Sequence, residues 1–550
     1  MDSPTYDEVG HISNGYSYVI THDFRLGPEH PPLLKNLSGL TLLAADKIFR
    51  LKIHFPLSSA SWNNHDQFSF AKKFLFFSGN NADAIVFFAR LPFLFLMVIF
   101  GIYLFLFTRK YFGENAALLA TFFYGLSPNI IAHGRLMTTD FGVSFFMFIS
   151  LFYFIDFLKN PTWKNSLKVG FVLGLTFLTK FSAIVLLPVF TVVWLSFHLV
   201  QHGWNREFFR QIHLKKWVLI FLMVSIIIWL VYYWNIFRMP QSYHDNFIKE
   251  VFCTKYTTAV QPFFLFLNHT VFLRPFSYFL FGPIWTSMTL KGMFEGHPFI
   301  WGHFVSGGFR HLFFPLTYVL KEPLSFLVLF FTVIYSIGFS IIKNRFGLLR
   351  KPRDFCRKVS FFIKNHPEEF TLLTFILFYW FIAIATAAFT GIRHILPVLP
   401  LTYVLISQYL FTRFKHFNKP VFVFLLIWYF GANIYIYPSY LAYSNEIAGG
   451  PKNGYKILTD ANVDWGQDLK RLAEYLEKNH FPTVNLDYFG MAEPAYYLGT
   501  RYIPYQSDKN PPKGLVAVSV TNYHKNRAYR WFSDKKPVAV IGYSILVYRI

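Results

Sequence analysis

Residues 84–107 read AIVFFARLPFLFLMVIFGIYLFLF, and this stretch decides the fold class. Arg90 is its one charged side chain. Because bilayer hydrocarbon is about 30 Å thick and an α-helix rises about 1.5 Å per residue, about 20 apolar residues are enough to cross it. The stretch therefore predicts a membrane-spanning helix.

Similar apolar runs follow along the chain as far as residue 439. We expect further spans near residues 115–132, 141–158, 217–236, 323–342, 370–389, 395–412 and 421–439. Residues 168–199 are too long for one span and are interrupted at Thr179, Lys180 and Ser182, so we interpret them as two shorter helices that meet near Lys180. The predicted fold is a polytopic α-helical membrane protein with about ten spans.

The composition excludes several other classes of protein. Of the 550 residues, 54% are apolar and 15% are charged, whereas a soluble protein has about 25% charged residues. A water-soluble globule and a disordered chain are thereby excluded, and two cysteines are too few for a disulfide-stapled domain. The net charge of +23 does not indicate nucleic acid, because the basic residues lie between apolar runs. Residues 1–40 are polar and show no signal-peptide pattern.

The positions of Lys and Arg indicate the orientation in the membrane. Alternate connections hold 20 Lys and Arg against five Asp and Glu, and short cytoplasmic loops are enriched in Lys and Arg. These connections are residues 108–114, 159–168, 201–216, 343–369 and 413–419. We therefore expect them in the cytoplasm and the intervening segments on the opposite side.

We expect three parts in the chain. Residues 1–83 form a first non-cytoplasmic loop with an acidic motif, residues 84–440 form the transmembrane core with a long outer loop at 237–322, and residues 441–550 form a non-cytoplasmic soluble domain. The last part has a helical pattern near residues 466–479 and the strand-like runs VNLDYF, GLVAVSV and VAVIGYSILVYRI. It is predicted to be a small α/β or α+β domain.

The acidic motif is Asp7-Glu8 in TYDEVGHISNGYSYVITHDFRLGPEHPPL. Adjacent carboxylates point in different directions on a helix, so one can act as a base while the other orients a partner or binds a cation. A solvated acidic segment is the alternative. His11 follows Asp7 by four residues and His22 comes later, a pattern that also allows a divalent metal. The alternative for these histidines is hydrogen bonding to water and lipid headgroups.

The second outer loop reads SPNIIAHGRLMTTDF and places Arg135 and Asp140 at the mouth of a span. An ionisable residue at membrane depth is costly and is by default a functional candidate. Asp140 can also cap the helix that we expect from residue 141.

Further cations occur at similar positions. Lys180 interrupts an apolar stretch, Arg393 and His394 lie in the short outer turn of TGIRHILPVLP, and Lys321 precedes a span in FFPLTYVLKEPL. Arg binds phosphate through two bonds and Lys as a point charge. With Arg135 they predict a non-cytoplasmic site for a lipid-linked phosphate, whereas snorkelling and interface anchoring are the alternatives.

The order and spacing of these motifs, with YSNEIAGGPKNGYKILTDANVDWGQDLKRLAEYL in the tail, resemble the phospholipid-carrier-dependent branch of glycosyltransferase family 39. This branch is similar to protein O-mannosyltransferases and lipid A aminoarabinose transferases. The resemblance covers about residues 4–500. It implies a C-type glycosyltransferase fold, and it implies Asp7, Glu8 and Asp140 as the acidic catalytic residues.

The resemblance also implies a reaction. A sugar would move from a polyprenyl-phosphate donor to a protein, lipid or glycan acceptor, with inversion, in a membrane such as the bacterial inner membrane and on its periplasmic or outer face. Arg135, Lys180, Lys321, Arg393 and His394 are our candidates for holding the donor phosphate. The other partners are membrane lipids, and no nucleic acid is expected.

One feature departs from the family pattern, since members carry a membrane helix before the acidic pair and only MDSPTY precedes Asp7 here. Either the start is truncated or mis-assigned, which is the interpretation that we favour, or the first helix is missing. A transporter or flippase and a non-catalytic lipid-phosphate-binding protein remain as alternatives. In NVDWGQDLKRL, Asp464 or Gly466 is expected to mark a helix start rather than a carbohydrate contact.

Overall fold

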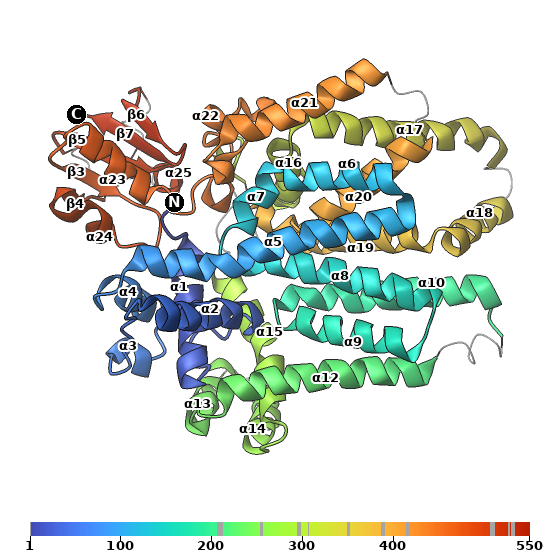
Figure 1. Cartoon of the computed structure of the whole chain (residues 1–550), viewed down its shortest axis with the longest axis horizontal. Coiled ribbons are helices and arrows are strands. Elements are labelled where there is room, and N and C mark those ends of the chain that lie inside the picture. Colours follow the sequence, from blue (N-terminus) through green and yellow to red (C-terminus); the bar gives the residue numbers. More distant parts are fainter. Residues whose placement is uncertain are drawn as a thin grey trace.

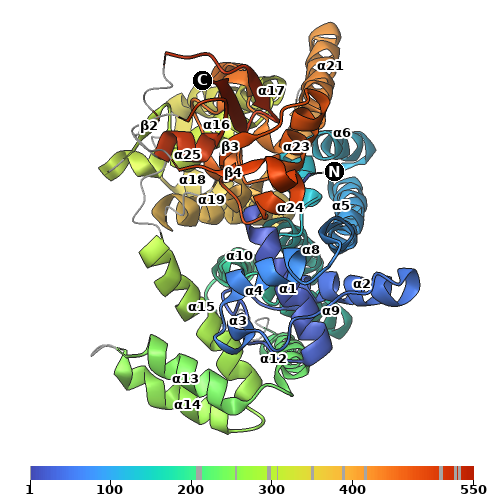
Figure 2. The ribbon, with the colours of Figure 1, turned by 90° about the vertical axis from the view of Figure 1, so that its left-hand side faces the viewer.

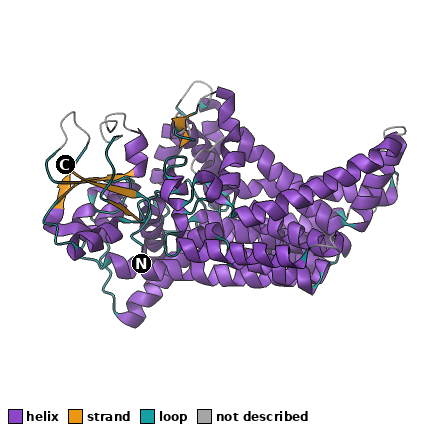
Figure 3. Ribbon diagram, turned by 90° about the horizontal axis from the view of Figure 1, so that it is seen from above, coloured by secondary structure: helices purple, strands orange, loops and turns teal. Residues whose placement is uncertain are grey.

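The computed structural model describes residues 2–205, 213–253, 257–293, 299–305, 307–348, 352–386, 391–413, 418–506, 512–525, 529 and 534–550. Long helices run side by side along the greatest length of the molecule, and the strands of the C-terminal sheet gather at one end (Figure 1). The turned view in Figure 3 shows the same separation of helices and sheet.

Four helices precede the first long span: α1 (Tyr6–Thr21), α2 (Leu33–Phe49), α3 (Ala60–Asn63) and α4 (Gln67–Phe76). Helices α1 and α2 pack backbone against backbone at Gly15 and Gly39. A Cβ atom on Gly39 would lie 2.1 Å from the carbonyl oxygen of Gly15, so only glycine allows this approach. The close contact fixes the direction of α1, whose first turn carries Asp7 and Glu8.

A helix is found at each of the expected spans, although the last residues of 370–389 lie outside the described part of the chain. The helices are α5 (Ala82–Phe112), α6 (Glu114–Gly125), α8 (Thr139–Lys159), α9 (Trp163–Phe177), α10 (Leu186–His202), α12 (Leu214–Ile236), α17 (Leu324–Leu348), α19 (Pro367–Thr386), α20 (Val398–Arg413) and α21 (Lys419–Ile436). Within the described residues, six helical segments are long and apolar enough to cross a membrane, or up to eight if each bent pair counts as one span.

The predicted span 115–132 is two helices rather than one. α6 ends at Gly125, and α7 (Pro128–Gly134) follows at an angle of 62°. The hydroxyl of Ser127 accepts a hydrogen bond from Ile130 N, and Pro128 occupies the first turn, which is a favourable helix start. These two residues therefore end one helix and start the next.

The predicted interruption near Lys180 is confirmed. Helix α9 ends at Phe177, Lys180 has extended backbone, and a short 3₁₀ helix η1 (Phe181–Val185) leads into α10. The break lets Lys180 leave the helical register and turn toward its partners.

The long outer segment folds as α13 (Gln241–Val251), α14 (Gln261–His269), α15 (Arg274–Met293), η3 (Gly307–Leu312) and α16 (Phe313–Lys321), with the short strands β1 (Phe299–Ile300) and β2 (His303–Phe304). Seen from the side in Figure 2, α13 and α14 lie apart from the sheet. Helices α1–α4 and the sheet lie at one end of the long helices, and α18 (Pro352–Asn365) lies at the other (Figure 1). The Lys and Arg distribution predicts this arrangement.

The C-terminal part contains a five-stranded mixed sheet of order β4-β3-β5-β7-β6. Its strands are β3 (Val484–Asp487), β4 (Tyr502–Pro504), β5 (Leu515–Ser519), β6 (Ala539–Ile541) and β7 (Ile545–Arg549), with helices α23 (Leu469–Lys478), α24 (Pro494–Leu498) and α25 (Val520–Lys525). β3 pairs in parallel with β4 and β5, and β7 pairs antiparallel with β5 and β6. The three strand-like runs predicted from the sequence are thus confirmed.

Residues 440–462 connect the last span to this domain through short helices: η5 (Tyr440–Ala442), η6 (Glu446–Ala448), α22 (Pro451–Gly454) and η7 (Asp460–Asn462). Helix α23 begins at Leu469, later than the predicted start at Asp464 or Gly466. The carboxylate of Asp464 instead accepts hydrogen bonds from Gly466 N and Thr521 N, so it holds a turn and joins it to the base of α25.

Candidate active site

Four of the predicted site residues meet in one chain of ion pairs. Arg393 Nη1 lies 2.5 Å from Asp7 Oδ2 and 3.5 Å from Asp140 Oδ2. Lys180 Nζ lies 2.6 Å from Asp140 Oδ1. We call Asp7, Asp140, Lys180 and Arg393 the acid–base cluster. Their positions in the sequence span nearly four hundred residues, so the fold alone brings them together.

Each member of the acid–base cluster sits where a helix begins or is interrupted. Asp7 and Asp140 lie in the first turns of α1 and α8, where negative charge is favoured by the helix dipole. Lys180 lies in the break before η1, and Arg393 lies in η4 (Ile392–Ile395), the turn before α20. Since α8 begins at Thr139, Asp140 is inside the helix rather than its cap, and the prediction of a cap for residue 141 is wrong.

The four side chains of the cluster differ in how much of their surface is exposed. The side chain of Asp7 is 29% exposed and that of Asp140 is 3% exposed. Lys180 and Arg393 are 14% and 11% exposed. Asp7 is therefore the carboxylate that an external group reaches most easily, whereas Asp140 is enclosed by its two cations.

The guanidinium of Arg393 is held from several directions. Its central carbon lies 4.2 Å from the centroid of the Trp465 ring, a cation–π contact. The side-chain oxygen of Asn462 accepts a hydrogen bond of 2.9 Å from Ile392 N, so the connecting segment also fixes the backbone of the turn. Trp465 was not among the residues assigned to the site from sequence. The signal that could have indicated it is a tryptophan between two acids, Asp464 and Asp468.

Lys321 lies outside the cluster and supports it. The buried Lys321 Nζ donates hydrogen bonds of 2.8 Å to Leu441 O and 2.5 Å to Asn462 O. It thereby ties α16 to the segment that carries Asn462. Within the described residues, no ion pair joins Lys321 to the cluster acids, and its contact with a donor phosphate stays a prediction.

Glu8 is also separate from the cluster. Arg90 forms two hydrogen bonds with its carboxylate, of 2.7 Å from Nε and 2.6 Å from Nη2. Met137 N, Thr5 N and Thr5 Oγ1 donate to the same carboxylate. Burial raises the pKa of Glu8, but the charge and hydrogen bonds of Arg90 outweigh burial and leave the pKa below its ordinary value. Glu8 is thus a fully bonded anion, and Arg90, the lone charge of the first apolar run, is its partner.

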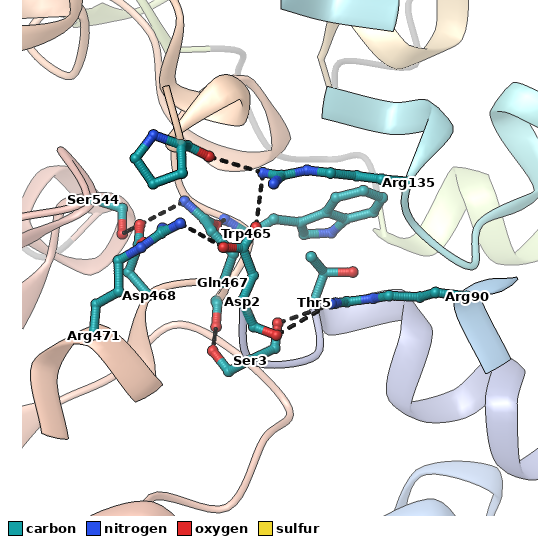
Figure 4. Close-up of polar contacts among 12 residues, drawn as sticks. Asp2, Ser3, Thr5, Arg90, Arg135, Trp465, Gln467, Asp468, Arg471 and Ser544 are labelled. Carbon is teal, nitrogen blue, oxygen red and sulfur yellow. Dashed lines mark hydrogen bonds and ion pairs between the residues drawn. The ribbon is translucent and has the colours of Figure 1, made fainter. Parts of the chain in front are cut away.

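Arg135 belongs to a different ion-pair network. Its Nη2 lies 2.7 Å from Asp2 Oδ2, and the other Asp2 oxygen lies 2.5 Å from Arg471 Nη2. Figure 4 shows Asp2 between these two arginines, with Ser3 bonded to the segment after Trp465. The backbone repeats this contact, because Ser3 N donates to Gln467 O and Tyr6 N donates to Trp465 O. Asp2 therefore joins Arg135, at the end of α7, to Arg471 of the C-terminal domain, and the contact of Arg135 with a donor phosphate stays a prediction.

The predicted histidines have different environments. Burial and the nearby Lys180 hold the pKa of His394 well below its usual range, so this imidazole is neutral near pH 7 and adds no positive charge for a phosphate. Burial lowers the pKa of His11 to about 3, and its ring packs edge-on against His30. His22 Nδ1 lies 3.1 Å from Trp234 O at the far end of α1. The structure does not bring His11 and His22 together.

In the described part of the chain, no group of three or more His, Cys, Asp or Glu side chains is arranged to hold a metal ion. The residues predicted as metal ligands accordingly do not fit such a group.

The family model described as dolichyl-phosphate-mannose-protein mannosyltransferase matches residues 73–232. The matched stretch includes Asp140 and Lys180, which are half of the acid–base cluster. The resemblance predicted from the sequence is confirmed over this range.

Two solved proteins match the chain over most of its length. ArnT from Cupriavidus metallidurans in the apo state is 11% identical, with a TM-score of 0.30, and the match covers 100% of this chain and 94% of that one. The same protein bound to undecaprenyl phosphate gives a TM-score of 0.31 at 11% identity and the same coverage. The Archaeoglobus fulgidus oligosaccharyltransferase in the apo form is 14% identical, with a TM-score of 0.44, over 93% of this chain and 58% of that one. Among curated proteins, none matches the chain.

Proposed function

We propose that the chain is an integral membrane glycosyltransferase that moves a sugar from a polyprenyl-phosphate donor to a protein, lipid or glycan acceptor. One observation carries this proposal: Asp7, Arg393, Asp140 and Lys180 form a continuous acid–base cluster, and two of the four lie in the stretch that matches the dolichyl-phosphate-mannose-protein mannosyltransferase model. Carboxylates to accept a proton and cations to receive a phosphate are the two things this reaction needs.

Lys180 and Arg393 are the groups that receive the donor phosphate. Both are largely buried, where a charge interacts more strongly than in water. Arg393 Nε is buried and makes no hydrogen bond within the described residues, so it offers a donor that is not used by Asp7 or Asp140. Preorganised cations of this kind stabilise the charge that develops on a leaving phosphate.

Asp7 is the group that accepts the acceptor's proton. It is the more exposed of the two cluster carboxylates, and Glu8 is fully engaged by Arg90. The acceptor oxygen or nitrogen forms a bond to the anomeric carbon of the sugar and loses its proton to Asp7. The bond between that carbon and the phosphate oxygen breaks, and the electron pair leaves with the phosphate. A single displacement inverts the anomeric centre.

The proposal includes a location and a division of the chain. Helix α1, whose first turn carries Asp7, lies at the end of the long helices opposite α18 (Figure 1). Helix α18 belongs to the loop 343–369, which its Lys and Arg content assigns to the cytoplasm. We therefore propose a site on the non-cytoplasmic side, facing the periplasm or exterior of a bacterial plasma membrane. Residues 1–83, 84–440 and 441–550 are the proposed outer loop, transmembrane core and soluble domain.

The proposal is tested with the full chain reconstituted in lipid vesicles and supplied with polyprenyl-phosphate mannose. Release of polyprenyl phosphate that depends on added acceptor is the expected result. Asp7→Asn should lower the rate by about 10² to 10⁴-fold, the range of general base catalysis, and Lys180→Met should lower it as well. Asp46→Asn, a carboxylate of α2 outside the cluster, is the matched control. Transfer that is unchanged by both cluster variants would contradict the proposal.

A transporter of lipid-linked sugars is the second candidate, and the bent helices favour it. Broken spans occur in both halves of the chain, at α6–α7 with a bend of 62° and between η3–α16 and α17 with a bend of 116°. The same vesicles distinguish the two functions. A transporter moves the intact donor between leaflets and releases no polyprenyl phosphate.

A further inference from the structure

The C-terminal domain contains a pocket that the acid–base cluster does not use. It has a volume of about 350 Å³ and is lined by residues of β3 and β4 and of the segments that follow these strands. This volume is within the range of small-molecule sites, about 300 to 1,000 Å³. The lining includes Lys72, Asp487, Tyr488, Glu493, Tyr502 and Pro504.

The walls of the pocket combine aromatic faces with hydrogen-bonding groups. Tyr488 and Tyr502 each supply a flat apolar ring with a polar hydroxyl at its edge. The Asp487 carboxylate is held in place by Asn522 Nδ2 at 2.7 Å and by Tyr529 Oη at 2.5 Å. Each of its oxygens has a second lone pair for a ligand hydroxyl. A rigid carboxylate beside aromatic rings suits a ligand with both an apolar face and hydroxyl groups.

One wall of the pocket contacts the segment that covers Arg393. Tyr488 Oη donates a hydrogen bond of 2.5 Å to Gly466 O, directly after Trp465, which covers Arg393. A Cβ on Gly466 would lie 2.7 Å from that hydroxyl, so the wall is closely packed. The next ring, Phe489, stacks on Tyr6 with 5.7 Å between centroids. The ring that follows the pocket residue Tyr488 therefore contacts Tyr6, the residue before Asp7.

We propose that this pocket binds a neutral sugar ring of an acceptor that carries a glycan. The inference rests on the proposed function, and it names the class of acceptor. A ring with hydroxyl groups at its edge matches the tyrosine faces and the fixed carboxylate.

The charge and strand geometry of the pocket exclude the other acceptor classes. The lining holds two carboxylates, Asp487 and Glu493, against Lys72, so it does not favour a phosphate-rich lipid headgroup. A peptide would add as a strand along β4, the edge of the sheet, but Pro504 in β4 has no N–H to donate and blunts that edge.

The test measures binding without any donor, so its result does not depend on sugar transfer. The full chain in lipid nanodiscs is titrated with maltose, cellobiose and chitobiose, and with an uncharged Ser/Thr peptide, and saturation-transfer NMR detects binding. At least one disaccharide should bind the native chain. Tyr502→Ala should weaken that binding about tenfold, the loss of one good stacking contact. Tyr502→Phe keeps the ring and should bind within about twofold of the native chain.

Tyr475→Ala, a tyrosine of α23 outside the pocket, is the matched control and should bind as the native chain does. The proposal is overturned if none of the three disaccharides binds, if Tyr502→Ala binds as tightly as the native chain, or if the peptide binds and displaces the sugar. Failure here with intact sugar transfer would remove the glycan pocket and leave the proposed function standing.

Discussion

Asp7 and Glu8 are adjacent in sequence but belong to different parts of the molecule. Neighbouring side chains on a helix point about 100° apart, so Asp7 faces Arg393 while Glu8 faces Arg90. Neutralising each carboxylate should therefore affect a different property of the protein. One variant should lose activity and the other should lose stability.

Glu8→Gln should destabilise the protein by about 3 to 5 kcal/mol, because it leaves Arg90 as a buried charge without its carboxylate. Asp7→Asn should change stability much less, since its side chain is partly exposed. Thermal unfolding in detergent, followed by the fluorescence of buried tryptophans, measures both. Equal midpoints for Glu8→Gln and the native chain would show that the pair with Arg90 contributes nothing.

Trp465 is expected to position Arg393. Trp465→Leu removes the cation–π contact, worth about 0.5 to 2 kcal/mol, and should lower kcat by about 2-fold to 30-fold. Trp465→Phe keeps an aromatic face and should recover most of this loss. The measurement is kcat and the donor KM of the native chain and of the two variants. A loss of stability that both variants share, with kcat unchanged, would indicate a purely structural role.

At the scale of elements, the sequence predicts helices and strands far better than it predicts their breaks. Apolar length alone indicates the spans, because hydrocarbon thickness sets it. The break at Ser127-Pro128 was harder to predict, because the signals of a helix cap and a proline lie within an apolar run that indicates one continuous span. Lys180 was easier, since a charge inside an apolar run must turn toward a partner.

The segment of residues 464–468 should make stability depend on pH. Burial raises the pKa of Asp464 to about 7 and that of Asp468 to about 6, compared with about 3.9 in an unfolded chain. Between these pKa values the folded chain binds more protons than the unfolded chain. The contribution of each carboxyl group to the free energy of unfolding therefore falls as pH rises. This penalty is complete above about pH 7.

Asp464→Asn removes that penalty for one group. The measured quantity is the unfolding midpoint of the variant minus that of the native chain. This difference should be larger at pH 8 than at pH 5. Buried histidines such as His11 titrate equally in both proteins and cancel in the difference. A difference that is constant across pH, or that falls, would show that Asp464 ionises normally.

At the scale of the whole molecule, partners far apart in sequence decide which predicted residues share a site. Asp7, Asp140, Lys180 and Arg393 were predicted from charges at the membrane surface, and the structure joins them. Arg135 has the same sequence signal, but its partner is Asp2. Lys321 binds carbonyl groups more than a hundred residues away. Charge at membrane depth therefore identifies candidates, whereas tertiary packing selects among them.

The orientation of the whole molecule can be tested with its two natural cysteines. Cys253 lies after α13 and Cys356 lies in α18, and both are exposed and free. The Lys and Arg distribution assigns the loop with Cys356 to the cytoplasm and the segment with Cys253 to the opposite face. A membrane-impermeant maleimide added to intact cells, with the outer membrane opened where there is one, should therefore label Cys253 alone. Permeabilised cells should show both labels, and Cys253→Ser should abolish the first. Labelling of Cys356 before permeabilisation would invert the orientation and place the acid–base cluster in the cytoplasm, where a donor on the outer leaflet cannot reach it.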